Sequence, residues 1–259
     1  MNKNKKIYKD KDLVSIIIPV YNAEIFLKDT IKTIKNQTYN NWEAIFVNDC
    51  SNDSSFKLLK EESKKDDRIK IVENKVNSGA AITRNNGLKN ANGRFICFLD
   101  ADDLWDKNKL KKQIKFMKEK KCEFSFLGYE FANEKGQPNG KKVYIPDKLN
   151  YEQALKNTTI FTSTVMFDMN KLNKEDIEMV NVLSEDTATW WKILKKVKYA
   201  YGLNEILVIY RRSKNSLSSD KFKAIKRIWN LYRNVEKLSL LKSCSCFITY
   251  SINALKRRI

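Results

Sequence analysis

The stretch Phe98-Leu99-Asp100-Ala101-Asp102-Asp103-Leu104-Trp105-Asp106-Lys107 carries most of the information on the fold. The apolar run at residues 94–99 predicts a buried strand, and carboxylates follow it almost at once. Like charges this close disfavour one another unless a positive charge lies among them. Ligands of open α/β sheets bind at the carboxyl ends of strands, so this stretch favours a divalent cation carrying a phosphate. Acidic surface loops show the same pattern. The strands and helices around this stretch decide whether it is a metal site or such a loop.

Strands and helices alternate through the first half of the chain. Apolar runs predict strands at residues 13–20, 42–48, 69–73 and 94–99, and helical segments follow at 24–36, 54–65, 79–90 and 108–120. This order predicts an α/β fold, with a mostly parallel sheet flanked by helices on both faces. The glycine-rich phosphate motifs of dehydrogenases and P-loop nucleotidases are missing from the sequence.

The second half follows a less regular pattern. Strands are predicted at residues 122–131, 143–145, 164–167 and 207–211, helices at 151–156 and 186–196, and a turn at 134–139. We expect these elements to extend the same sheet. Residues 1–220 are therefore predicted to form one domain, and residues 221–259 a basic amphipathic helical tail.

Composition excludes several kinds of chemistry. The chain has no histidine, which removes His-based nucleophiles, bases and zinc sites. The formal net charge of +19 favours a polyanionic partner, either a nucleic acid, a phosphorylated substrate or an anionic membrane. A lysine-rich composition of the whole source proteome would give the same excess.

The sequence favours a cytoplasmic protein. No run approaches the length of a transmembrane helix, and the polar start lacks the features of a signal peptide. The five cysteines lack a Cys-x-x-Cys pair and are expected to be reduced and buried. In residues 221–259 basic residues far outnumber the single acid, Glu236, and apolar residues recur at helical spacing. Such a helix suits the anionic inner face of a cell membrane, or its apolar stripe packs against the rest of the protein.

Four ordered segments carry a resemblance to a known family. They are Val14-Ser15-Ile16-Ile17-Ile18-Pro19-Val20-Tyr21-Asn22, Val47-Asn48-Asp49-Cys50-Ser51-Asn52-Asp53-Ser54, Asn77-Ser78-Gly79-Ala80-Ala81-Ile82-Thr83-Arg84-Asn85 and Asp100-Ala101-Asp102-Asp103. Together they resemble the family-2 glycosyltransferases, inverting enzymes of the GT-A fold. The resemblance covers residues 13–218 and implies a nucleoside diphosphate sugar donor, with UDP expected.

The resemblance implies a role for most of these residues. Pro19 and Tyr21 would lie against the base, Asp49 would accept from a uracil-type N–H, and Asn77 and Arg84 would lie at the nucleotide. For Asp49 and Asp53 the alternative is capping of the following helix, and this is the main expectation for Asp53.

The resemblance implies different roles for the carboxylates of the segment Asp100–Asp103. Asp100 would meet the ribose or sugar, while Asp102 would hold the Mg²⁺ or Mn²⁺ that bridges the diphosphate. Without that ion the carboxylates would repel the diphosphate. Asp103 is expected to support the following loop.

A last motif, Leu183-Ser184-Glu185-Asp186-Thr187-Ala188-Thr189-Trp190-Trp191, matches the family's Glu-Asp pair. The resemblance implies that Asp186 is the general base for the acceptor hydroxyl. Capping of a helix is the alternative, and it fits Glu185 better. Glu185, Trp190 and Trp191 are candidates for the acceptor site, and we expect one indole there and the other in the core.

Two departures from the family pattern stand out. Many relatives have Asp-Asp-Gly-Ser after the second strand, where this chain has Asn48-Asp49-Cys50-Ser51. Relatives often show Tyr-Arg-x-His in the late strand, where this chain has Tyr210-Arg211-Arg212-Ser213. Arg212 or Lys214 is a candidate to replace the lost phosphate contact.

The sequence thus predicts a metal-dependent, inverting glycosyltransferase acting on a glycan or polyprenyl-linked acceptor in bacterial surface polysaccharide synthesis. Three alternatives stay open: a sugar-1-phosphate nucleotidyltransferase, a nucleic-acid-binding protein and a catalytically dead scaffold. The first lacks its glycine-rich basic loop, and a nucleic-acid partner is not expected unless the basic residues form one groove.

Overall fold

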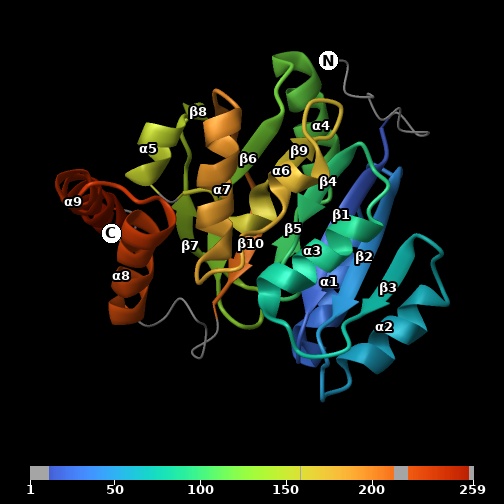
Figure 1. Cartoon of the computed structure of the whole chain (residues 1–259). Coiled ribbons are helices and arrows are strands. Elements are labelled where there is room, and N and C mark those ends of the chain that lie inside the picture. Colours follow the sequence, from blue (N-terminus) through green and yellow to red (C-terminus); the bar gives the residue numbers. More distant parts are fainter. Residues whose placement is uncertain (1–11, 158, 213–220, 257–259) are drawn as a thin grey trace, which may run out of the picture.

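The computed structural model describes residues 12–157, 159–212 and 221–256. Within them, ten strands form one sheet in the order β3-β2-β1-β4-β9-β6-β10-β5, with β7 pairing β6 and β8 pairing β10 (Figure 1). The strands are β1 Val14–Val20, β2 Trp42–Asn48, β3 Ile69–Glu73, β4 Phe95–Phe98, β5 Leu104–Trp105, β6 Phe124–Ala132, β7 Pro138–Val143, β8 Lys148–Leu149, β9 Met166–Asp168 and β10 Ala200–Arg211.

The first four strands form the parallel half of the sheet. β1 pairs in parallel with both β2 and β4, and β2 pairs in parallel with β3. The helices are α1 Glu24–Lys35, α2 Ser55–Ser63, α3 Gly79–Asn90, α4 Lys109–Lys120, α5 Tyr151–Leu155, α6 Lys174–Ile177, α7 Glu185–Lys196, α8 Lys221–Asn230 and α9 Leu240–Lys256. The predicted α/β fold with a helix-flanked sheet is confirmed, and the bounds in this half agree to within a residue or two.

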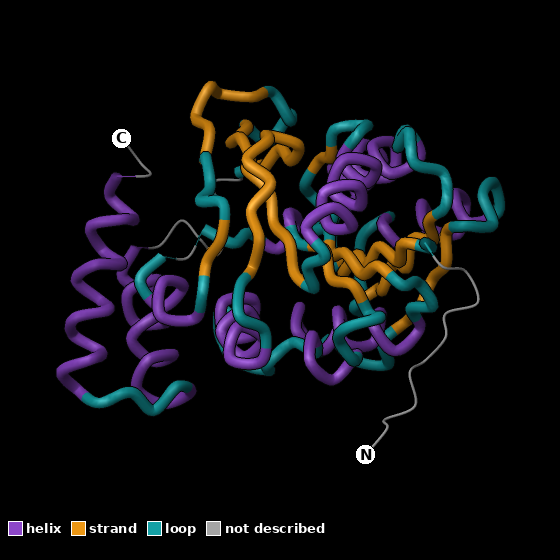
Figure 2. The backbone as a smooth tube through the Cα atoms, turned by 90° about the horizontal axis from the view of Figure 1, so that it is seen from above, coloured by secondary structure: helices purple, strands orange, loops and turns teal. Residues whose placement is uncertain are grey.

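Helices cover both faces of the sheet (Figure 2). Successive side chains of a strand point to opposite faces, so Ile16 and Ile18 join one core and Ile17 the other. The first core contains the apolar residues of α1, α2 and α4, and the second contains those of α3, α5 and α7. This double burial explains why β1 and β2 are apolar at nearly every position.

The second half of the sheet is mixed rather than parallel. β9 runs antiparallel to both β4 and β6, while β6 and β10 are parallel to each other. The sequence pattern missed β5 and β8, placed β7 too late and found only residues 207–211 of β10. These segments are short, polar or interrupted, because β7 is mostly exposed and β10 carries register shifts. Tertiary pairing, rather than an apolar pattern, makes them strands.

The C-terminal helices pack one side against the rest of the protein. A π-helical turn at Leu231–Val235 links α8 to the chain before α9, and Tyr232 stacks on Trp191 with centroids 5.3 Å apart. The outer side of α9 carries apolar side chains, of which Leu241 is 85% and Ile248 59% exposed. The expectation that the tail packs against the rest of the protein is confirmed for its described residues, and contact of its outer side with a membrane stays a prediction. The predicted boundary at residue 220 lies outside the described residues.

Candidate active site

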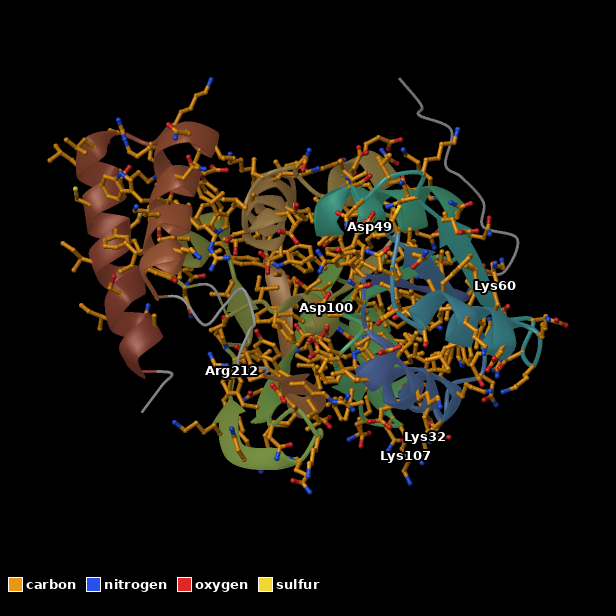
Figure 3. The ribbon with its side chains drawn as sticks, turned by 90° about the horizontal axis from the view of Figure 1, so that it is seen from below. Lys32, Asp49, Lys60, Asp100, Lys107 and Arg212 are labelled. Carbon is orange, nitrogen blue, oxygen red and sulfur yellow. The ribbon has the colours of Figure 1, made fainter. Side chains whose placement is uncertain are left out.

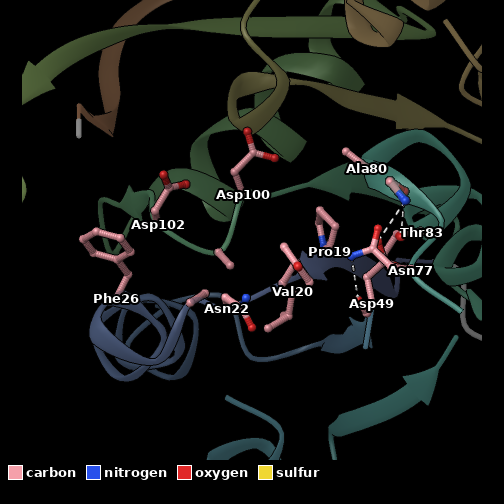
Figure 4. Close-up of a pocket in the computed structure, with 14 residues that line it drawn as sticks. Pro19, Val20, Asn22, Phe26, Asp49, Asn77, Ala80, Thr83, Asp100 and Asp102 are labelled. Atoms are coloured by element: carbon pink, nitrogen blue, oxygen red, sulfur yellow. Dashed lines mark hydrogen bonds between the residues drawn. The ribbon is translucent and has the colours of Figure 1, made fainter. Parts of the chain in front are cut away.

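A cavity of about 450 Å³ opens at the carboxyl ends of β1, β2 and β4 (Figure 4). Its walls come from the loops after these strands and from the start of α3. It brings together most of the residues expected at a nucleotide site, and it is lined by Pro19, Val20, Tyr21, Asn22, Ala23, Phe26, Asp49, Asn77, Gly79, Ala80, Thr83, Asp100, Ala101 and Asp102. Tyr21 is half exposed and available to a planar ligand.

Asp49 closes the floor of this cavity and also holds α3. Its Oδ1 accepts hydrogen bonds from the Asn74 side chain (2.7 Å) and the Ser78 N–H (2.8 Å), and its Oδ2 accepts from the Gly79 N–H (2.9 Å). Asp49 therefore caps α3, far along the chain, rather than the helix that follows it. A carboxylate oxygen can accept two hydrogen bonds, so Oδ2 keeps capacity for a ligand N–H.

Asp53 caps helices, as its position predicted. Its Oδ1 accepts from the Ser55 N–H at 2.9 Å, and its Oδ2 accepts from the Glu24 N–H at 3.0 Å. In return, the Glu24 side chain accepts from the Ser54 N–H at 2.8 Å. A side chain near the start of each helix thus accepts a hydrogen bond from the backbone at the start of the other. Asp53 thus fixes the loop beside the cavity.

Cys50 adopts a left-handed backbone conformation, with φ of +60°. This is the position where the resembling family often has glycine, which takes up such a φ without steric cost. The Cys50 thiol donates to the Asn74 carbonyl at 3.3 Å. Cys50 therefore keeps the turn that glycine would form, at the cost of local backbone strain. The five cysteines are free, and Cys244 is exposed where a buried thiol was expected.

Arg84 joins two distant parts of the site. Its guanidinium donates to Asp100 at 2.6 Å and to Glu185 at 2.7 Å, and its side chain is 6% exposed. Burial alone would lower the pKa of Arg84, but the charges of Asp100 and Glu185 raise it above its ordinary value. Arg84 is thus a charged link between the end of β4 and the start of α7.

The remaining acids of the Asp100–Asp103 segment have raised pKa values. Burial and the charge of Asp100 raise the pKa of Asp102 to about 6. Burial and the charges of both neighbours raise the pKa of Asp103 well above its ordinary value. Asp103 accepts from the Ser163 hydroxyl at 2.5 Å and from the Arg211 N–H at 3.2 Å, so it supports the loop as expected.

Asp186 lies in the first turn of α7 and is partly accessible. Its Oδ1 accepts from the Thr187 N–H at 2.6 Å, and its Oδ2 lies 3.4 Å from the Thr162 hydroxyl. Burial and the charge of Glu185 raise the pKa of Asp186 to about 6. A carboxylate with a raised pKa is better suited to accept a proton near neutral pH.

Trp190 and Trp191 are both core residues. Their indole N–H groups donate to the carbonyls of Ile160 and Ala154, at 3.2 and 3.1 Å. The Trp190 ring packs among Phe98, Phe124 and Phe167, and Trp191 stacks on Tyr232. The expectation that one indole lines an acceptor site is not met, because each residue is at most 2% exposed.

The segment Thr162–Thr164, a short 3₁₀ helix η1, was not expected at the site. Thr162 contacts Asp186, and the Ser163 hydroxyl accepts from the Asp100 N–H at 3.1 Å while donating to Asp103. The segment thus touches both acidic motifs. Short hydroxyl side chains carry no distinctive pattern, so the sequence alone did not single it out.

Within the described ranges no group of three or more carboxylate or thiol side chains forms a metal cage. Asp102 and Asp100 face the same cavity (Figure 4). A divalent cation held here would need further oxygen ligands, which a diphosphate can supply. Burial is the main cause of the raised pKa of Asp102 and the charge of Asp100 the second, and a cation bound beside the two carboxylates would favour their ionised forms.

The family model described as "Glycosyl transferase family 2" matches residues 15–177. The putative teichuronic acid biosynthesis glycosyltransferase TuaG of Bacillus subtilis is 45% identical over 250 residues, covering 96% of this chain and 98% of that protein. The Escherichia coli enzyme UDP-Glc:alpha-D-GlcNAc-diphosphoundecaprenol beta-1,3-glucosyltransferase WfgD is 41% identical over 224 residues, covering 86% of each chain.

Solved structures show the same fold at low identity. TarS of Staphylococcus aureus, in complex with UDP-GlcNAc, matches with a TM-score of 0.69 and 19% identity over 92% of this chain and 71% of that one. The mannosyltransferase PcManGT of Pyrobaculum calidifontis, in complex with GDP-Man and Mn²⁺, matches with a TM-score of 0.67 and 16% identity over 94% and 70%. From the family match and these relatives, the chain belongs to glycosyl transferase family 2 and is a glycosyltransferase of GT-A fold.

Proposed function

We propose that this glycosyltransferase moves a sugar from a UDP-sugar to a glycan or polyprenyl-linked glycan hydroxyl with inversion at the anomeric carbon. The single observation that carries the proposal is the Arg84 link, which joins the cavity acid Asp100 by ion pairs to Glu185, the residue before the candidate base Asp186. A nucleotide cavity and a candidate base that are joined in this way can act on one bond.

The donor is proposed to occupy the cavity at the carboxyl ends of β1, β2 and β4. Tyr21 and Pro19 would contact the base, and the open capacity of Asp49 Oδ2 would accept from a uracil-type N–H. Asn77 lines the same wall, where its side chain donates to the Asp49 carbonyl at 3.3 Å. Arg84 is proposed to act indirectly, since its two terminal nitrogens already bind Asp100 and Glu185.

The reaction is proposed to use Mg²⁺ or Mn²⁺ with Asp102 as a ligand and Asp100 on the ribose or sugar side. Such a cation would neutralise the negative charge that develops on the departing diphosphate. Asp103 and Ser163 would hold the loop that presents these carboxylates.

Asp186 is proposed as the general base. The acceptor oxygen would attack the anomeric carbon on the face opposite the diphosphate, the bond to the diphosphate would break, and the hydroxyl proton would pass to Asp186. A carboxylate suffices when proton transfer is late, because bond formation to an electron-poor carbon has already acidified the hydroxyl. One displacement of this kind inverts the configuration.

The setting is proposed from the relatives and from the surface. TuaG is named for teichuronic acid biosynthesis and WfgD for a diphosphoundecaprenol-linked acceptor, which favours bacterial surface polysaccharide synthesis at the inner face of the cell membrane. None of the described helices is long and apolar enough to span a bilayer. Residues 1–220 are proposed as the transferase domain and residues 221–259 as the tail through which it contacts an anionic membrane, with no nucleic-acid partner.

The test is calorimetric titration of the protein with UDP, first with Mn²⁺ and then with EDTA, alongside Asp102→Asn. We expect binding that requires the metal and that the variant loses. Binding of another nucleoside diphosphate would keep the fold and change the donor, whereas no nucleotide binding would refute the proposed function.

A further inference from the structure

Four aromatic side chains form a connected cluster at one edge of the sheet. They are Tyr129 and Phe131 of β6, Phe161 before η1, and Tyr210 of β10, and we call them the aromatic platform. The rings of Phe161 and Tyr210 stack with centroids 4.3 Å apart, and Tyr210 lies 5.4 Å from Phe131. Tyr129 contacts the other three at 5.3–6.1 Å.

The platform lies where ligands of such sheets bind. β6 and β10 are parallel, and Phe131 pairs directly with Tyr210 near the carboxyl ends of both strands. The cavity lies at the carboxyl ends of β1, β2 and β4. β4 and β6 run in the same direction, because β9 is antiparallel to both. The platform and the cavity therefore share the carboxyl edge of one sheet, which is the ligand-binding edge of open α/β folds.

The chain connects the platform directly to the proposed base. Phe161 is followed by Thr162, whose hydroxyl lies 3.4 Å from Asp186 Oδ2, and then by Ser163, which contacts Asp100 and Asp103. A ring of the platform and a contact to Asp186 thus come from two adjacent residues. A ligand resting on these rings would lie beside the carboxylate that is proposed to take its proton.

The platform differs from the aromatic residues of the core. Trp190, Trp191 and their neighbours are buried, while Phe131, Phe161 and Tyr210 are half-buried and Tyr129 forms their base. Arg212 adds a charge, because its guanidinium lies 4.6 Å from the centre of the Phe131 ring and the residue is exposed. In Figure 3 Arg212 is seen on the same side of the molecule as Asp100.

We infer that the aromatic platform is the acceptor subsite, and that it takes a pyranose ring bearing a nearby anionic group. The C–H face of a pyranose is apolar and packs on aromatic rings, while its hydroxyls stay hydrated. Arg212 would bind the anion, which is either a phosphate at the reducing end or a carboxylate of a uronic acid. This inference rests on the proposed function, because it assigns the partner of the same reaction.

The test is saturation-transfer NMR on the full chain in the presence of UDP and the diamagnetic ion Mg²⁺, which would occupy the donor cavity. The probes are methyl N-acetylglucosaminide, N-acetylglucosamine 1-phosphate and methyl glucuronide. Phe161→Leu and Tyr210→Leu remove a ring but keep apolar volume. Tyr201→Leu is the matched control, because Tyr201 is a half-buried aromatic residue at the amino end of β10, next to Tyr199.

We expect Phe161→Leu and Tyr210→Leu to weaken probe binding at least about threefold, the value of one ring contact, with Tyr201→Leu unchanged. Arg212→Gln should weaken only the anionic probes, and the stronger of the two identifies the anion as phosphate or carboxylate. Equal binding in all variants, or no binding of any probe to the UDP-bound protein, would overturn the inference. UDP affinity measured in the same samples separates this result from failure of the proposed function.

Discussion

The two halves of the sheet differ in how they build their part of the site. In the β1–β4 half, the proposed donor residues lie at or just after the carboxyl end of a strand or just before a helix, and the strands are parallel and apolar. In the β6–β10 half, the strands are mixed in direction and irregular in register. The first half resembles a general nucleotide fold, whereas the second is assembled by contacts between distant segments. Arg84 is one of the residues that join the two, together with Asp103 and Ser163.

The difference indicates where specificity is built. The donor cavity depends on backbone positions and on short loops that cap one another, as Asp49 and Asp53 do. The face proposed for the acceptor depends on side chains from β6 and β10 and on Phe161, just before η1. We therefore expect changes in the first half to affect binding of the nucleotide, and changes in the second to affect the choice of acceptor.

The largest effect should come from breaking the link between the halves. Arg84→Met removes the only charge placed between Asp100 and Glu185 by the contacts described above and leaves two partly buried carboxylates uncompensated. We expect it to lower the free energy of unfolding by about 3–5 kcal/mol, measured by urea denaturation. A loss below about 1 kcal/mol would show that the halves hold together without this network.

An added methyl group in the core of the first half should destabilise the fold less than Arg84→Met does. Gly87 on α3 faces β1, and an added Cβ would lie 2.5 Å from Ile17 Cγ2. Gly87→Ala should therefore destabilise the fold by about 1–3 kcal/mol despite the better helix propensity of alanine. Thermal unfolding checks this, and an unchanged or raised Tm would mean that α3 can shift on the sheet without cost.

The pH response should report the raised pKa of Asp186. The pKa of Asp186 in the folded protein is about 6, above its ordinary 3.8. Its ionisation therefore lowers the free energy of unfolding as pH rises from about 4 to 6, and this loss persists at higher pH. Asp186→Asn should thus be at least as stable as the wild type at pH 7.5, and lose that advantage near pH 4. For the wild type, kcat/KM should fall about tenfold per pH unit below about 6. A flat profile between pH 5 and 7 would exclude Asp186 as the titrating base.

The smallest effect is expected for an exposed ion pair of the second half. Lys112 and Glu205 form a 2.5 Å contact, but their side chains are 45% and 40% exposed. Lys112→Met should change the free energy of unfolding by less than about 1 kcal/mol, and even less in high salt. It serves as the matched control for Arg84→Met, and an equal loss in both would remove the distinction between buried and exposed pairs.

The sequence predicted the first half well because the information there is local. Apolar runs mark β1 to β4, and the proposed donor residues lie at their ends or within a few positions of them, as Asp49 and Asp102 do. It could not foresee that Asp49 caps α3, because that contact joins residues about thirty positions apart. The same holds for the aromatic platform. Trp190 and Trp191 follow Asp186 in sequence, but helix geometry turns both indoles into the core.

The most direct test measures UDP affinity and UDP-sugar turnover in two variants, one from each half. Tyr21→Ala alters an exposed wall of the cavity, and should weaken UDP binding about tenfold by removing a stacking surface. Asp186→Asn should leave UDP affinity within about twofold, while turnover falls about 10²–10⁴-fold. A loss of UDP affinity in Asp186→Asn, or turnover close to that of the wild type, would contradict the division of the site into a donor half and a half that supplies the base.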